Sequence, residues 1–259
     1  MEKRLKILVT NDDGIFAKGL SELVKIAKAF GEVKVVAPDK GQSGMGHAIT
    51  VESPVRLNKI KTDWGVEAYS CSGTPVDCVK IAISQVFDQK PDLLLSGINH
   101  GANNSINVIY SGTMSAAVEG ALENIPSIGF SLLNHSADAD FSACAALFPR
   151  IIERVISDDF PENICLNVNI PMLPASEIKG TRVCRQALGK WDDSFEERTD
   201  PMKQPYYWLK GQFLNHDKGL DTDVWALENG YVSIVPTQFD MTAHHAISHL
   251  NQNNYGEGK

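Results

Sequence analysis

The chain has 259 residues, 43% of them hydrophobic and 22% charged, which suits one large α/β domain or a core domain with a smaller appendage. Its formal net charge of −8 argues against a protein that coats duplex nucleic acid, because such a protein needs a basic surface. No apolar run suits a membrane helix or a signal peptide, and five cysteines without a Cys-x-x-Cys motif indicate neither a disulfide framework nor a zinc site. We therefore expect a cytoplasmic protein with no membrane partner.

The start of the chain has the pattern of a strand, a helix and a second strand. Residues 5–10 form a short apolar run, and the apolar residues of 18–30 recur at helical spacing, with Gly31 after them. Residues 33–38 are again apolar and β-branched. This order predicts a parallel sheet, and hence a doubly wound α/β fold.

The middle of the chain continues this alternation. Residues 49–57 and 66–71 have an extended pattern that could form a hairpin. A helix is well marked over 73–87, because Thr74 can cap it and Pro75 suits its first turn. We expect further helices over 113–124 and 138–157, and strands over 92–97, 127–132 and 165–171.

The composition changes in the last third of the chain. The stretch 186–211 is polar and aromatic without helical periodicity, which predicts exposed loops and hairpins in an arm that reaches a partner chain. A short helix and a strand are expected over 221–236, and a last short helix over 242–250. We therefore expect a core of residues 1–180 and a C-terminal portion of residues 181–259.

The region of the expected arm carries an unusual number of aromatic residues among its charges. They are Trp191, Phe195, Tyr206, Tyr207, Trp208 and Phe213. On free loops these side chains would expose a larger apolar patch than monomers usually tolerate. Packing against a second copy of the chain would cover them with twofold symmetry, so the sequence predicts a homodimer or a larger even-numbered oligomer.

Three polar loops follow three of the expected core strands. The first holds Asp12 and Asp13, the second Ser43, and the third Asn99. Ligands of open α/β sheets bind beyond the carboxyl ends of the strands, so we expect these side chains to meet. Two carboxylates, a hydroxyl and an amide oxygen are hard donors that suit Mg²⁺ or Mn²⁺ rather than zinc. Taken alone, Asp13-Gly14 also fits an ordinary turn.

A second candidate feature is Ser111-Gly112-Thr113, where the helix over 113–124 is expected to begin. A helix N-terminus offers free N–H groups and a positive partial charge to a phosphate, and Asn103 on the same loop could add a neutral donor. The alternative is a plain Ser/Thr helix cap. No Walker A motif is present, and the glycines of 41–46 do not match the dinucleotide fingerprint.

The histidines have weaker signals. His245 and His249 are four residues apart on the expected last helix, which is a metal-ligand spacing, but no third ligand lies near in sequence. A surface or interface position is therefore favoured for both. His47 and His100 lie in the site loops, where each is a general acid, a substrate contact or simply a solvated side chain.

Six stretches of the chain resemble, in the same order, motifs of the SurE family of survival-protein nucleotidases: VTNDDG, APDKGQSG, SGTPVDCV, LLSGINHGANN, YSGTMSAAVEGA and VPTQFDMTAH. The resemblance covers most of the chain. It implies a Rossmann-like, mostly parallel sheet and a C-terminal portion that exchanges between subunits of a dimer or tetramer. It also implies metal-dependent hydrolysis of nucleoside 5′- and 3′-monophosphates to nucleoside and phosphate.

The resemblance also implies roles for individual residues. It assigns one divalent ion per subunit, Mg²⁺ or Mn²⁺, to Asp12, Asp13, Ser43 and Asn99, and phosphate contacts to Asn103, Ser111, Gly112 and Thr113. Family members often carry Arg where Gln42 stands and Asp where Asn107 stands. These two departures bear on substrate preference and loop geometry, not on the reaction class.

We interpret the chain as a phosphomonoesterase in which Asp12 or Asp13 also acts as the base toward water, and the residues leave open which. One rival is an aspartyl-phosphate mechanism, although its usual D-x-D pattern differs from these adjacent acids. A second rival is a nucleoside hydrolase, which also clusters N-terminal aspartates, around calcium. A third is a non-catalytic sensor that binds a metal–nucleotide complex and signals through its C-terminal arm.

Overall fold

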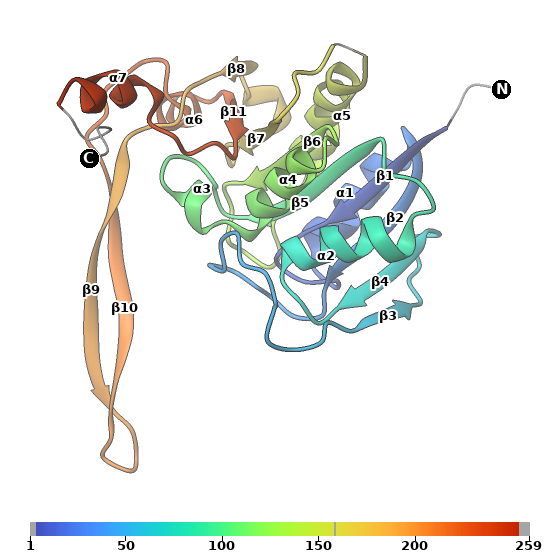
Figure 1. Cartoon of the computed structure of the whole chain (residues 1–259), viewed down its shortest axis with the longest axis horizontal. Coiled ribbons are helices and arrows are strands. Elements are labelled where there is room, and N and C mark those ends of the chain that lie inside the picture. Colours follow the sequence, from blue (N-terminus) through green and yellow to red (C-terminus); the bar gives the residue numbers. More distant parts are fainter. Residues whose placement is uncertain (1–3, 158, 254–259) are drawn as a thin grey trace.

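A mixed sheet of nine strands forms the centre of the computed structural model, which describes residues 4–157 and 159–253 (Figure 1). The strands are β1 (Leu5–Thr10), β2 (Gly31–Pro38), β3 (Leu57–Ile60), β4 (Glu67–Cys71), β5 (Leu93–His100), β6 (Ser127–Leu132), β7 (Ile164–Ile170), β8 (Thr181–Val183) and β11 (Val232–Gln238). Their order is β3-β4-β2-β1-β5-β6-β7-β11-β8. The strands from β4 to β7 in this order are parallel, whereas β3 and β11 run antiparallel to β4 and β7.

Helices cover both faces of the sheet, as a doubly wound fold requires. They are α1 (Lys18–Ala27), α2 (Pro75–Ile81), α3 (Asn107–Tyr110), α4 (Gly112–Leu122), α5 (Ser142–Ser157), α6 (Asp223–Glu228) and α7 (His244–Gln252). On one face, α1 and α5 pack with Ile7 and Val9 of β1; on the other, α2 and α4 pack with Leu8. Alternate residues of β1 thus enter opposite cores, which explains why its buried residues Ile7, Leu8 and Val9 are consecutively apolar.

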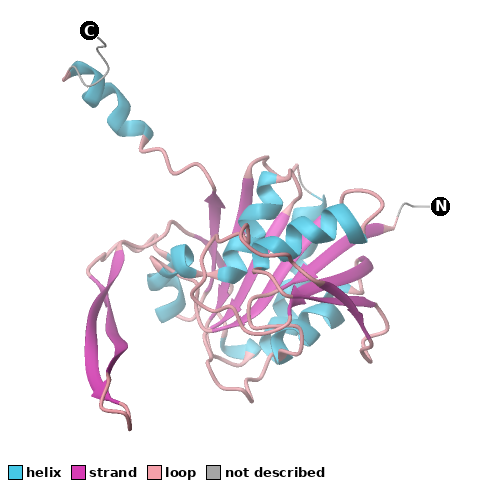
Figure 2. Ribbon diagram, turned by 60° about the horizontal axis from the view of Figure 1, so that its bottom comes forward, coloured by secondary structure: helices cyan, strands magenta, loops and turns pink. Residues whose placement is uncertain are grey.

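The C-terminal part adds two strands to the same sheet and also forms two segments that leave the body of the protein. β11 lies between β7 and β8, so the sheet continues across the division expected at residue 180. A separate two-stranded hairpin consists of β9 (Gly189–Thr199) and β10 (Pro205–Asn215). The hairpin and α7 both project from the body in Figure 2. The predicted exposed hairpin in 186–211 is confirmed.

Most expected elements are present, with shifted boundaries. The helix expected over 73–87 is α2 followed by a π-helical stretch, Ala82–Val86, and Thr74 caps it in a capping box with Asp77. The extended segment over 49–57 stays irregular until β3 begins at Leu57. All five cysteines are free and buried. Among the described residues, no helix is both long enough and apolar enough to cross a membrane.

Candidate metal and phosphate site

The loop after β1 is held in a tight turn that brings a second loop beside it. The side-chain amide of Asn11 donates to the carbonyl oxygen of Gly14 (2.9 Å), and Gly14 has a φ of +102°, which favours glycine. The backbone N–H of Gln42 donates to the carbonyl oxygen of Asp12 (2.7 Å). This bond places the loop that carries Ser43 directly against the Asp12–Asp13 turn.

The end of β5 supplies the third loop. The side-chain N–H of Asn99 donates to the carbonyl oxygen of Gly101 (2.8 Å), which uses the amide nitrogen and leaves the amide oxygen available to a ligand. The backbone N–H of His100 approaches Oδ2 of Asp13 at 3.3 Å. The three loops therefore meet beyond the carboxyl ends of the strands, as their positions in the sequence predict.

Asp12 is the most enclosed member of this group. Its side chain is almost fully buried, with 3% of the residue exposed, and Oδ1 accepts a short hydrogen bond from the Thr113 hydroxyl. A Cβ atom added to Gly112 would lie 2.6 Å from Cβ of Asp12. Only glycine therefore allows the first turn of α4 to pack this closely on the carboxylate.

Burial leaves the two adjacent carboxylates without enough compensating positive charge. Burial first, and the neighbouring charge of Asp13 second, raise the pKa of Asp12 to about 6. Burial also raises the pKa of Asp13. A divalent cation between the two groups would stabilise both charges, so their environment fits a bound metal ion.

The donor atoms fit a hard cation. Asp12 and Asp13 offer carboxylate oxygens, Ser43 an exposed hydroxyl and Asn99 a free amide oxygen. Among the described residues, no group of three or more His, Cys, Asp or Glu side chains is placed to hold a metal ion. The set is thus an all-oxygen one with two charges, which suits Mg²⁺ or Mn²⁺ and leaves room for water and substrate.

A cavity of about 440 Å³ opens over this set. Its lining includes Asp12, Ser43, Asn99, Asn103 and Ser111, together with Gly44, His100, Ala102, Asn107, Tyr110, His135, Trp191 and Phe213. Asp13, Gly112 and Thr113 are not among the lining residues. The structure therefore brings five of the eight residues expected at the site to the wall of one cavity.

The residues expected to contact phosphate have internal partners. Oγ of Ser111 accepts from the backbone N–H of Met114 (3.0 Å), as a helix cap does. The Thr113 hydroxyl is fully buried on Asp12. Asn103 donates from its side chain to Oγ of Ser131 (2.9 Å). The backbone N–H groups of Thr113 and Met114 are used as well, by Asp12 and Ser111, so the positive end of the α4 dipole is what remains to favour a phosphate here.

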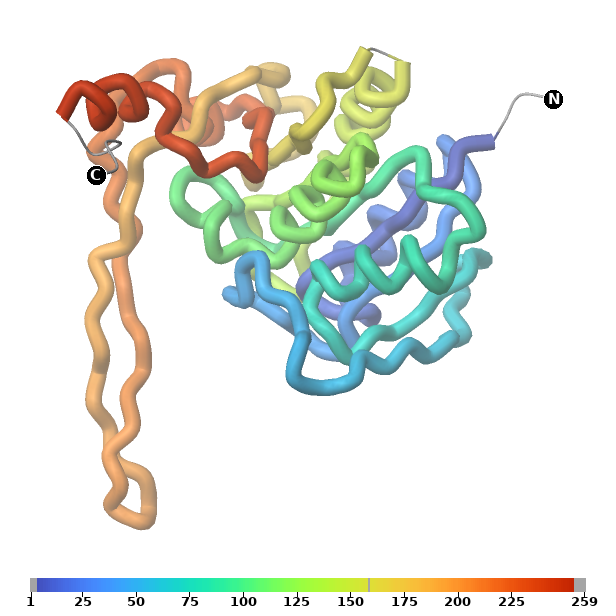
Figure 3. Tube along the Cα trace, viewed as in Figure 1, coloured from blue at the N-terminus to red at the C-terminus, as the bar shows by residue number. Residues whose placement is uncertain are grey.

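A buried carboxylate that sequence analysis missed anchors the Ser43 loop. Glu119, in the middle of α4, receives hydrogen bonds from Nε2 of His47 (2.9 Å) and from the Lys80 ammonium group. In Figure 3 the loop over 39–56 lies beside the α3 segment, where the N–H of Gly46 donates to the carbonyl oxygen of Tyr110 (3.2 Å). The sequence could have indicated a role for Glu119, because it is the one charged residue in a helix of otherwise small or apolar residues.

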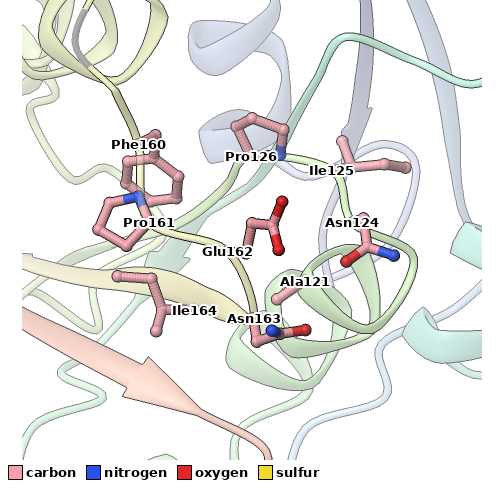
Figure 4. Close-up of a pocket in the computed structure, with 9 residues that line it drawn as sticks. All are labelled: Ala121, Asn124, Ile125, Pro126, Phe160, Pro161, Glu162, Asn163 and Ile164. Atoms are coloured by element: carbon pink, nitrogen blue, oxygen red, sulfur yellow. The ribbon is translucent and has the colours of Figure 1, made fainter.

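Other candidate features lie away from the cavity. His245 and His249 are on α7, outside the cavity lining. A pocket of about 130 Å³ lies between the end of α4 and residues 160–164, and Figure 4 shows Glu162 as its one charged lining side chain. These residues precede β6 and β7, so the pocket is at the opposite edge of the sheet from the loops described above.

Comparisons with known proteins agree with this arrangement. A family model described as survival protein SurE matches residues 7–193. The 5′-nucleotidase SurE of Flavobacterium psychrophilum is 56% identical over 95% of this chain and 96% of that protein. The 5′-nucleotidase SurE of Bacteroides fragilis is 49% identical over 96% of this chain and 97% of that protein. The crystal structure of the SurE protein from Aquifex aeolicus matches with a TM-score of 0.82 and 38% identity, over 96% of this chain and 99% of that one.

Proposed function

Because this chain belongs to the SurE family, we propose that it is a metal-dependent nucleotidase that hydrolyses nucleoside 5′- and 3′-monophosphates to nucleoside and phosphate. The relatives named above support the 5′-nucleotidase activity. The observation that carries the proposal is the adjacent pair Asp12–Asp13, of which Asp12 is buried and lines a cavity together with neutral oxygen donors. Such a pair is costly to bury unless a cation joins it.

We assign one Mg²⁺ or Mn²⁺ ion per subunit to Asp12, Asp13, Ser43 and Asn99. When bound, such a cation supplies positive charge to a phosphoryl oxygen and makes water more acidic. The chain's own part is to hold the four donors in place. Gln42 fixes the Ser43 loop against Asp12 through a backbone bond, and Thr113 fixes the Asp12 carboxylate.

The reaction is a displacement at phosphorus. A water oxygen bonds to phosphorus, the bond from phosphorus to the ester oxygen breaks, and the departing nucleoside oxygen takes up a proton. Asp12, which lines the cavity, or its neighbour Asp13 accepts the proton of the attacking water. The dipole of α4, whose N-cap residue Ser111 lines the cavity, stabilises the negative charge on the phosphoryl oxygens.

Two other reaction classes predict different products. A nucleoside hydrolase would release a free base, and a metal–nucleotide sensor would bind without turnover. The experiment is to incubate one nucleoside monophosphate with the protein and Mn²⁺ and to quantify inorganic phosphate, nucleoside and free base by chromatography. Equal amounts of phosphate and nucleoside support the proposal, whereas free base or an unchanged nucleotide would overturn it.

We also propose that the protein works as a cytoplasmic homodimer or homotetramer that assembles through the β9–β10 hairpin. Phe195, Tyr207, Trp208 and Leu209 are all more than half exposed on this hairpin. Two strands alone cannot bury these side chains, because a lone hairpin has no second layer. A further copy of the chain provides that layer.

A further inference from the structure

We propose that Trp191 and Phe213, at the root of the β9–β10 hairpin, form an aromatic wall on which the nucleobase of the substrate stacks. This inference rests on the proposed nucleotidase function and adds to it the part of the substrate that the arm recognises. It gives the hairpin a role in substrate choice in addition to assembly.

The two rings belong to the same cavity as the candidate metal donors. Trp191 and Phe213 line it together with Asp12, Ser43 and Asn99, although the two aromatic residues come about 90 to 200 positions later in the sequence. They are direct cross-strand partners in the hairpin, with ring centroids 5.9 Å apart and planes at 63°. The cavity therefore has a polar, anionic part and an aromatic part.

The indole of Trp191 is fixed in orientation and yet open to a ligand. Its Nε1–H donates to Oδ1 of Asn107 (2.8 Å), on the short helix α3 beside the candidate phosphate loop. The indole N–H therefore has its partner, and the residue remains 40% exposed. An aromatic face that is accessible while its polar edge is satisfied is a suitable stacking surface.

The root of the hairpin is also clamped to the site loop. Asp223, a fully buried carboxylate, accepts from the backbone N–H groups of Ser105 (2.7 Å) and Ala187 (3.0 Å). Oγ of Ser105 accepts from the N–H of Gly189 (3.0 Å) and donates to the carbonyl oxygen of Ala187 (2.8 Å). These bonds hold the aromatic wall next to the loop that carries Asn103 and Ser111, and they do not depend on the position of the hairpin tip.

A nucleoside monophosphate matches this two-part cavity, because its phosphate suits the metal donors and its base suits the rings. Stacking on an aromatic side chain tolerates every base, since each base has a π face. We therefore expect the wall to favour nucleotides over sugar phosphates that lack a base, and to favour the larger purines over pyrimidines.

The test compares phosphate release from AMP and from ribose 5-phosphate by the full-length protein with Mn²⁺. We expect Trp191→Leu to lower kcat/KM for AMP by about tenfold, mainly through KM, and to leave ribose 5-phosphate within about twofold. Trp191→Phe keeps a ring and should retain most of the AMP activity. Trp64→Leu is the matched control, because Trp64 packs against the core and lies outside both the hairpin and the cavity lining.

Circular dichroism verifies that each variant is folded. An equal loss of activity toward both substrates would overturn the inference, because Trp191 would then act only by holding Asn107 and the site loop. Unchanged AMP activity in Trp191→Leu would also overturn it. If the wild-type protein releases phosphate from neither substrate, the proposed function itself is wrong, which is a distinct result.

Discussion

The hydroxyl of Thr113, in the first turn of α4, donates a hydrogen bond to Oδ1 of Asp12, at the end of β1. These residues lie 101 positions apart in the chain, and both are buried. The bond orients the Asp12 carboxylate toward the first turn of α4. Thr113, which sequence analysis treated as a phosphate contact, thus positions a proposed metal ligand.

This relationship predicts the effect of Thr113→Val, which keeps the shape of the side chain and removes its hydroxyl. Loss of a group that orients a metal ligand typically costs about 10–100-fold in metal affinity or activity. We expect a decrease of that size in turnover at limiting Mn²⁺, partly restored by excess metal. Titration of activity against Mn²⁺ concentration measures it.

Thr10→Val is the matched control for that substitution. The Thr10 hydroxyl is buried as well, but it has no hydrogen-bond partner among the described residues. Its removal should leave the dependence on Mn²⁺ unchanged and the melting temperature equal or higher. If Thr113→Val behaves in the same way as Thr10→Val, the hydroxyl does not position Asp12.

The buried Glu119 predicts a pH-dependent contribution to stability. Burial alone would raise its pKa, but hydrogen bonds from His47 and Lys80 outweigh burial and lower the pKa below its usual value. A lowered pKa in the folded state stabilises the protein above the usual Glu pKa of about 4.3, and this stabilisation is lost as the pH falls through the lower value. Glu119→Gln should therefore cost about 1–3 kcal/mol of unfolding free energy at pH 7.

Denaturant unfolding at pH 7 and at pH 3.5 measures this difference. The difference in unfolding free energy between the wild-type protein and Glu119→Gln should be smaller at pH 3.5 than at pH 7. Glu123→Gln, at the end of the same helix and partly exposed, should show no such gap at either pH. If the difference in unfolding free energy for Glu119→Gln is the same at both pH values, the folded protein does not preferentially stabilise the ionised form of Glu119.

The exposed aromatic side chains of β9 and β10 predict self-association. Light scattering at low micromolar concentration should give twice or four times the 28.4 kDa of one chain. Shortening the hairpin to remove residues 195–209 should lower this mass or make the protein poorly soluble. A stable monomer with full activity would contradict assembly through the hairpin.

The parts of the site that lie close to strand ends could be predicted from the sequence. Asp12, Ser43 and Asn99 follow apolar runs whose order indicated a parallel sheet, and the carboxyl ends of such strands meet at one edge. Capping by Thr74 was likewise visible, because the N-cap residue and its partner lie within one turn of the chain.

The remaining parts of the site and of the fold depend on contacts between segments that are distant in the sequence. The hydrophobic periodicity of a single segment does not indicate such contacts. Trp191 reaches the cavity only because Asp223 ties the hairpin root to Ser105. Thr113 was predicted at the site, but its partner Asp12 is set by how closely α4 packs at Gly112. The strand β11 was expected, but its place in the core sheet was not, and the short strand β8 was missed because it has no apolar run.

The most direct test of the central claim measures phosphate release from a panel of nucleoside monophosphates in Mg²⁺, Mn²⁺ or EDTA, for the wild-type protein and Asp12→Asn. We expect turnover by the wild-type protein with a divalent ion, none in EDTA, and a loss of at least about 100-fold in Asp12→Asn. Without metal, the variant should melt no lower than the wild-type protein, because it removes a repelled, buried charge. Undiminished phosphate release in EDTA, or near-wild-type turnover by folded Asp12→Asn at limiting metal, would contradict the account.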